Sequence, residues 1–150
     1  ARGEPIEAVL PAPLRLRGHA IEARVYAEDP VRFLPSPGPL TVYRPPVGEG
    51  VRVETGYAEG GRVTSYYDPM LAKVIATGAD RAQAISRLRA ALDAFAIEGV
   101  KTNIPFIQQV LADDDFIAGR IDTGLAQRVL AGEAMAETRA PGAASAPAST

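Results

Sequence analysis

Cysteine is absent from this chain of 150 residues, and histidine occurs only once, as His19. Without a thiol the chain has no disulfide, no thiolate nucleophile and no cysteine ligand for a metal ion. A single histidine makes a His-rich zinc site impossible within the chain and disfavours a Ser-His-Asp triad. These shortages exclude the residue sets that mark most zinc sites and many covalent hydrolases.

Long apolar runs and an excess of positive charge are also missing. No run approaches the ~20 apolar residues that a membrane-spanning helix needs, and no secretory signal is recognisable. Lys and Arg number 16 against 18 Asp and Glu, so the formal net charge is −2 and offers little attraction to a phosphate backbone. We therefore expect a cytoplasmic location, with neither a membrane nor a nucleic acid as partner.

The remaining composition, 47% hydrophobic and 23% charged, fits one ordinary globular domain. Three prolines in residues 1–16 disfavour regular secondary structure, and we expect an extended segment that connects to a preceding domain. Residues 17–131 carry the patterns of a folded domain. Residues 132–150 are rich in Ala, Pro and Ser, and we expect a flexible linker that leads to a further domain.

Alternation of apolar and polar residues predicts the strands. It is clearest at residues 19–27 and recurs at 51–55. Short apolar runs predict further strands at 40–43 and 70–77, with a proline-rich turn at 35–39 before the first of them. These strands fall in the first half of the chain.

Helical periodicity dominates the second half. Asp80 is the expected N-cap of a helix whose apolar stripe extends to Phe95 and which Gly99 ends. A second helix is expected from Thr102 or Asn103, and a third, short one after residues 122–123. We expect the acidic run 113–115 to be a solvated loop. The segregation of strands from helices predicts an α+β fold, an antiparallel sheet covered by two to three C-terminal helices.

The strand at residues 19–27 is the most informative segment. Its inward face begins with His19, which we expect to be a hydrogen-bonded core histidine. Its outward face places Glu22 and Arg24 two residues apart, pointing the same way. A planar, permanent cation on a rigid strand can stabilise developing negative charge. The ordinary alternative is a surface ion pair of little energetic value.

The run RGHAIEARVYAEDP at residues 17–30 resembles the C-terminal domain of the biotin carboxylase family. Five further blocks continue the resemblance, in the family's order and spacing, up to about residue 131. Several blocks in register are much more specific than one. The blocks are FLPSPG (33–38), GVRVE (50–54), YYDPMLAKVI (66–75), EGVKTN (98–103) and DTGL (122–125).

The resemblance implies an enzyme that carboxylates biotin with ATP and bicarbonate. It implies that Arg24 stabilises the enolate-like form of biotin and that Arg24, Glu22 and Asp68 help to bind biotin or bicarbonate. A structural role remains open for Glu22, and a turn-capping role for Asp68. The ATP-grasp fold, the Mg²⁺ ligands and the general base lie upstream in this family, so the chain alone is expected to be inactive and to hold no metal.

The resemblance also implies a homodimer interface at Arg52 and Glu49, although some relatives have a bulky aromatic residue where this chain has Glu49. Arg87 is expected either at the periphery of the active site or on a solvated helix face. We expect the whole protein to be the α-chain of an acyl-CoA carboxylase, working with a biotin carrier domain and a carboxyltransferase subunit. Urea and pyruvate carboxylases remain open as hosts.

Two other readings remain open at this point. The same fold could serve as a non-catalytic dimerisation or interaction module. It could also be the closing domain of a different ATP-grasp ligase, although the run at residues 17–30 disfavours that.

Overall fold

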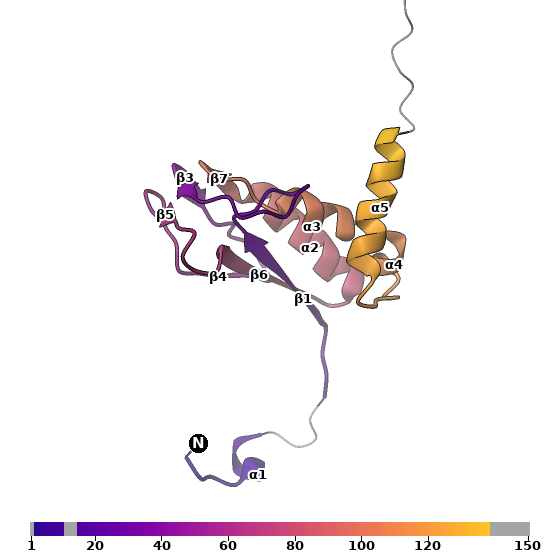
Figure 1. The fold of residues 1–150 in the computed structure, drawn as a ribbon. Coiled ribbons are helices and arrows are strands. Elements are labelled where there is room, and N and C mark those ends of the chain that lie inside the picture. Colours follow the sequence, from indigo (N-terminus) through magenta and orange to yellow (C-terminus); the bar gives the residue numbers. More distant parts are fainter. Residues whose placement is uncertain (1, 11–14, 139–150) are drawn as a thin grey trace, which may run out of the picture.

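The computed structural model describes residues 2–10 and 15–138, and it has the expected α+β architecture (Figure 1). A three-stranded antiparallel sheet is accompanied by two short strand pairs and by helices. The elements in chain order are α1 (Ile6–Val9), β1 (His19–Tyr26), β2 (Gly38–Pro39), β3 (Val42–Arg44), β4 (Val51–Thr55), β5 (Arg62–Val63), β6 (Met70–Gly78), α2 (Arg81–Ala94), β7 (Ala96–Glu98), α3 (Ile104–Val110), α4 (Asp114–Ile117) and α5 (Leu125–Thr138).

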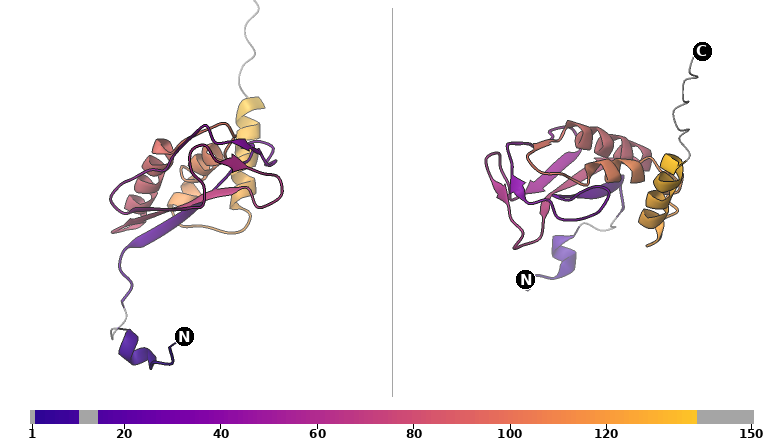
Figure 2. Two further views of the ribbon diagram at one scale, coloured as in Figure 1. Left: turned by 90° about the vertical axis from the view of Figure 1, so that its left-hand side faces the viewer. Right: turned by 45° about the horizontal axis from the view of Figure 1, so that its top comes forward.

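The main sheet has the strand order β1-β6-β4. Its inner face is apolar, as the alternation in the sequence predicts, with Ala23 at 5% exposure and Val25 and Val74 at 0%. Helix α2 packs against this face and buries it, and Figure 2 shows the same layering from two further directions. The other face of the sheet carries the polar residues of the same strands, so the layering determines which side chains meet solvent.

Helix α2 begins as predicted. Asp80 is its N-cap, and the Asp80 carboxylate accepts a hydrogen bond of 2.8 Å from the Gln83 amide. The Gln83 side chain returns to the Ala79 amide at 2.7 Å, so two otherwise free donors are satisfied. Leu88 and Leu92 of its apolar stripe are buried against the sheet.

The expected end of this helix at Gly99 is wrong. Helix α2 stops at Ala94, and residues Ala96–Glu98 form β7, which pairs with β3. Phe95 is buried as its spacing predicts, but through an edge-on contact with the Tyr43 ring at 5.3 Å between centroids. The pairing with a segment some fifty residues earlier overrides the helical spacing.

The expected strand at residues 40–43 is displaced and divided. Gly38–Pro39 of the expected turn form β2, which pairs with β5, and Val42–Arg44 form β3, which pairs with β7. Leu40 lies between them, where its backbone exchanges hydrogen bonds with Gly60 and Gly61. Two different partners for adjacent short segments explain why a single strand does not form.

The acidic run 113–115 is also not a simple loop. Asp113 caps α4, because its carboxylate accepts hydrogen bonds from the amides of Asp115 and Phe116. Asp114 and Asp115 occupy the first turn of this helix, where their negative charges interact favourably with the unpaired amide groups of the helix N-terminus.

Helix α5 is longer than the short helix expected after residue 122. It extends to Thr138, so the first seven residues of the expected linker, 132–138, are helical. The rest of that linker, residues 139–150, lies outside the described residues, as do residues 11–14 of the N-terminal segment. Within the described part of the chain, no helix is long and apolar enough to cross a membrane.

Candidate functional site

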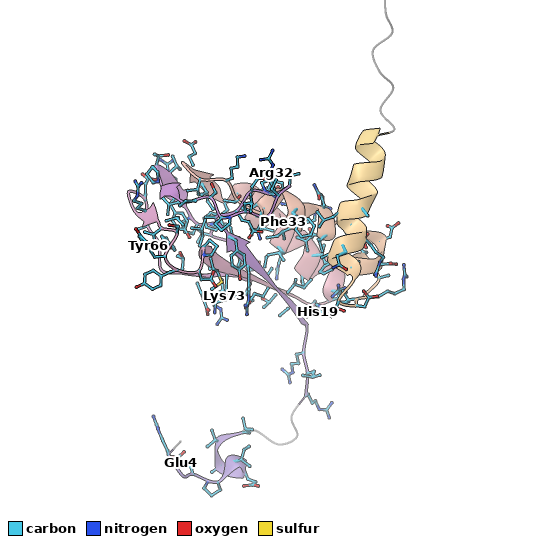
Figure 3. The ribbon with its side chains drawn as sticks, viewed as in Figure 1. Glu4, His19, Arg32, Phe33, Tyr66 and Lys73 are labelled. Atoms are coloured by element: carbon cyan, nitrogen blue, oxygen red, sulfur yellow. The ribbon has the colours of Figure 1, made fainter. Side chains whose placement is uncertain are left out.

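The outer face of the main sheet places charged residues in two neighbouring rows. The strand register aligns Arg24 of β1 with Lys73 of β6 and Glu54 of β4. In the next row, Glu22 lies opposite Ile75, and Ile75 lies opposite Arg52. The period of two that buries the opposite face therefore gathers three of the six candidate residues, Glu22, Arg24 and Arg52, on one surface. Figure 3 shows Lys73 on the side of the sheet that faces away from α2.

Ion pairs connect these residues along and across the strands. The Arg24 Nε lies 3.1 Å from a Glu22 carboxylate oxygen. Lys73 Nζ lies 3.1 Å from one oxygen of Glu54, and an Arg52 nitrogen lies 3.3 Å from the other. Lys73 and Arg52 together hold the pKa of the Glu54 carboxyl below its usual value.

Arg24 is available to an anion outside the chain. Its side chain is 60% exposed, so it is not buried in the core. The hydrogen bond that Arg24 donates to the Glu22 carboxylate raises the pKa of Arg24 most, and the Tyr26 phenol raises it further; both neighbours belong to β1. Arg24 also borders a depression of about 260 Å³ between β1 and helix α3, whose apolar lining includes Phe106 and Val110.

Asp68 lies in the turn that leads into β6. Its carboxylate accepts a hydrogen bond of 2.8 Å from the Met70 amide, which is the geometry of the turn-capping alternative. A depression of about 310 Å³ lies between β4 and the beginning of β6 and is bordered by Glu54 and Lys73. Tyr67 and Tyr66 beside Asp68 are 84% and 87% exposed, and Tyr66 projects outward in Figure 3.

Glu49 and Arg87 form a contact that the sequence did not indicate. An Arg87 nitrogen lies 2.7 Å from a Glu49 oxygen and another lies 2.8 Å from the Thr77 carbonyl oxygen. The Arg87 side chain is only 26% exposed, so the expectation of a solvated helix face is wrong. Arg52 pairs with Glu54 instead of Glu49, and it is 70% exposed.

His19 is not a core histidine. It is half-buried at the start of β1, and its Nε2 lies 3.1 Å from an Arg81 nitrogen. Arg81 also donates to the Phe116 carbonyl oxygen and lies over the Phe116 ring, 4.6 Å from its centroid. The histidine therefore joins the start of β1 to the helical layer, away from Arg24.

The loop after β1 is fixed by Asp29, which the sequence analysis did not single out. Its carboxylate accepts hydrogen bonds of 3.0 Å from the amides of Val31 and Arg32 and pairs with Lys101 at 2.6 Å. These contacts, led by Lys101, hold the pKa of Asp29 far below its usual value. Phe33, which completes the turn, has a φ of 55°, a strained value for a bulky side chain.

Asn103 is the second residue that sequence reasoning missed. Its side chain and amide bind the backbone of Arg24 and Tyr26. The EGVKTN block marked its neighbourhood, but no local pattern indicates which backbone an asparagine will bind.

Comparison with known proteins assigns the fold. The biotin carboxylase C-terminal domain family matches residues 22–128, which include most of the described chain. The chain belongs to the biotin carboxylase C-terminal domain family. This membership confirms the resemblance found in the sequence and favours it over the closing domain of a different ATP-grasp ligase.

Individual relatives agree with the assignment. A biotin carboxylase of Halalkalibacterium halodurans is 52% identical over 108 residues, which are 72% of this chain and 24% of that protein. A propionyl-CoA carboxylase alpha chain of Ruegeria pomeroyi is 43% identical over 144 residues, covering 82% of this chain and 21% of that protein.

Solved structures of the family have the same fold. The biotin carboxylase domain dimer of the Hydrogenobacter thermophilus 2-oxoglutarate carboxylase, in complex with MgADP, ADP and bicarbonate, superposes with a TM-score of 0.75 at 38% identity. That match covers 78% of this chain and 27% of the solved chain. The present chain thus spans about a quarter of the length of its relatives.

Among the residues that the structure describes, no group of three or more His, Cys, Asp or Glu side chains is placed to hold a metal ion. The acidic residues of the outer sheet face are already paired with Arg24, Arg52 and Lys73. The chemistry that this surface offers is that of an exposed cation on a fixed strand.

Proposed function

We propose that this chain is the C-terminal part of a biotin carboxylase, which carboxylates biotin with ATP and bicarbonate, and that Arg24 is its contribution to the chemistry. The family membership supports the reaction class. The observation that carries the role of Arg24 is its position, exposed on the outer face of β1 and bordered by a depression.

The chemistry explains why a fixed guanidinium is useful. Biotin supplies a ureido nitrogen that becomes nucleophilic when its proton is removed. Loss of this proton places negative charge on the ureido oxygen. A guanidinium beside that oxygen stabilises the charged state more than the neutral one, and this difference lowers the barrier. Because Arg24 is held on a strand, little reorganisation is needed when the charge develops.

The neighbouring residues support Arg24 in different ways. Glu22 shares its strand face and orients the guanidinium through their hydrogen bond of 3.1 Å. Asp68 shapes the turn before β6 and contributes to the biotin-binding side of the site. The ATP-grasp domain, the Mg²⁺ ligands and the base that removes the biotin proton belong to the polypeptide upstream of this chain.

The complete protein works as the α-chain of an acyl-CoA carboxylase, with a biotin carrier domain and a carboxyltransferase subunit as partners. It acts as a homodimer, with Arg52 and Glu49 at the interface. The support for the acyl-CoA type is the alignment with the propionyl-CoA carboxylase alpha chain over 82% of this chain.

The test is the variant Arg24→Ala in the complete enzyme. We expect its kcat for biotin carboxylation to fall by about 10²–10³, the usual effect of removing one charge-stabilising donor. Arg44→Ala is the matched control, because Arg44 is also an exposed strand arginine paired with a glutamate, Glu59, at 3.6 Å. Turnover of the Arg24 variant near the wild-type value would show that the assignment of Arg24 is wrong.

A further inference from the structure

Asn103 binds the backbone of β1 at the position of Arg24. The Tyr26 amide donates to Asn103 Oδ1 at 2.9 Å, and Asn103 Nδ2 donates to the Arg24 carbonyl oxygen at 3.2 Å. A third bond, of 3.3 Å, runs from the Asn103 amide to the Tyr26 carbonyl oxygen. One asparagine therefore makes three hydrogen bonds to a segment that lies more than seventy residues earlier in the chain.

These bonds lie close to an irregularity in the pairing of β1 with β6. On its other edge β1 pairs regularly with β6 as far as Val25, and the register then shifts between Val25 and Tyr26. Such an irregularity interrupts the hydrogen-bond ladder and bends the strand. Arg24 lies one residue before this irregularity, and Asn103 binds the opposite edge of β1 at Arg24 and Tyr26. The segment that carries the guanidinium is therefore held from both edges.

The side chain of Asn103 is also diverted from the role expected at its position. It is the N-cap residue of α3, where an asparagine side chain commonly accepts a hydrogen bond from a helix amide. Asn103 makes no such bond. Pro105 in the first turn has no amide hydrogen, which reduces the need for a cap. Both polar groups of the carboxamide are thus directed to β1.

We infer that Asn103 is a positioning residue for Arg24, and this inference rests on the proposed role of Arg24 in biotin carboxylation. The two neighbours that raise the pKa of Arg24, Glu22 and Tyr26, are themselves on β1. The position of the exposed guanidinium therefore depends on the position of the β1 backbone. Asn103 fixes that backbone against α3, and through it the distance between the guanidinium and a bound ligand.

A double-mutant cycle in the complete enzyme tests the inference. We expect Asn103→Ala to lower kcat by about tenfold, because small misplacement of a charge-stabilising group is costly, and to leave the KM for ATP unchanged. If Asn103 acts through Arg24, the double variant with Arg24→Ala has the same kcat as Arg24→Ala alone, within about twofold. An independent structural role would multiply the two losses.

A measurement on the strand itself accompanies the kinetics. The Tyr26 amide loses its acceptor in Asn103→Ala, so its hydrogen exchange is expected to accelerate by about tenfold. Gln108→Ala is the matched control: Gln108 also binds through its carboxamide, to the Arg89 carbonyl oxygen at 3.0 Å and to Asp93 at 2.8 Å, but it joins α3 to α2. This control is expected to keep the wild-type kcat and Tyr26 exchange.

The outcomes separate the two claims. If Arg24→Ala has wild-type turnover, the proposed role of Arg24 is wrong and the inference about Asn103 falls with it. If Arg24→Ala is impaired but the two losses multiply, or Asn103→Ala has wild-type kcat, only the positioning role of Asn103 is overturned. If the Gln108 control loses as much activity as Asn103→Ala, the effect belongs to α3 packing in general and the inference is also overturned.

Discussion

The Arg24 guanidinium and the Glu22 carboxylate lie 3.1 Å apart on one face of β1, and the two side chains remain 60% and 40% exposed. An exposed pair of this kind contributes little to stability, because solvent screens the attraction between the two charges. The pair instead orients the guanidinium, because the contact with Glu22 restricts the rotamers of the long Arg24 side chain. In the described structure, no residue of another strand forms an ion pair with Arg24.

The first prediction concerns Glu22. Glu22→Ala removes the orienting partner but leaves the cation on its strand, so we expect kcat to fall about three- to tenfold, much less than in Arg24→Ala. Steady-state kinetics of the complete enzyme would measure this. A loss equal to that of Arg24→Ala would indicate a direct chemical role for the carboxylate instead.

The second prediction concerns the proposed dimer interface. Glu49→Arg reverses the charge beside Arg87, and like charges at an interface are unfavourable. We expect the dimer dissociation constant of the complete protein to rise at least about tenfold, measured by analytical ultracentrifugation. Glu98→Arg, a charge reversal on β7, is the control and should leave dimerisation unchanged. An unchanged dimer in Glu49→Arg would remove Glu49 from the interface.

The third prediction is a pH dependence. Lys101 and the amides of Arg32 and Val31 lower the pKa of Asp29 in the folded chain. The unfolded carboxyl titrates near pH ~3.9, so Asp29 contributes stability above that pH, and the contribution is lost as the pH falls toward the folded pKa. Asp29→Asn should be less stable than the wild type at pH 7, with a difference that shrinks below pH ~4.

Urea unfolding at several pH values would check this third prediction. Lys101→Met serves as the companion variant, because it removes the contact that lowers the pKa of Asp29 most and keeps the two amide donors. Its acid sensitivity should therefore lie between those of the wild type and Asp29→Asn. An Asp29→Asn variant whose stability deficit is the same at pH 3 and pH 7 would contradict the proposed linkage.

The fourth prediction concerns the core beneath the site. Leu88 of α2 is 0% exposed, and Leu88→Ala removes methyl and methylene groups that fill this space. We expect the free energy of unfolding to fall by about 2–5 kcal/mol. The exposed neighbour Arg89→Ala is the control, expected within about 0.5 kcal/mol of the wild type. A small effect at Leu88 would mean that α2 is not essential to the burial of the sheet.

The sequence was sufficient for elements whose patterns are local. The alternation at residues 19–27 predicted β1 and the faces of Glu22 and Arg24, and the spacing of Asp80 and Gln83 predicted the start of α2. Strand β7 could not be predicted, because Ala96–Glu98 pairs with β3 and continues the apolar spacing of the helix before it. Helix α4 was missed because an acidic run also fits a solvated loop.

The site was less predictable than the fold. Charge and alternation identified Arg24 as exposed, but its chemical role came from the family resemblance. The contact of Glu49 with Arg87 joins residues 38 positions apart, and that of Asn103 with Arg24 joins residues 79 apart. A glutamate or asparagine has many partners of equal chemistry, so only the folded chain shows which one it meets.

The position of β1 at the end of its sheet has a practical consequence. Asn103 occupies the outer edge of β1 only at Arg24 and Tyr26, while alternation along the strand turns the amide and carbonyl groups of Ala20 and Glu22 toward the same edge. In the described structure no strand covers that stretch. An unpaired strand edge of this kind can pair with the same edge of another copy. We therefore expect the isolated domain to aggregate at high concentration unless a neighbouring part of the polypeptide covers this edge.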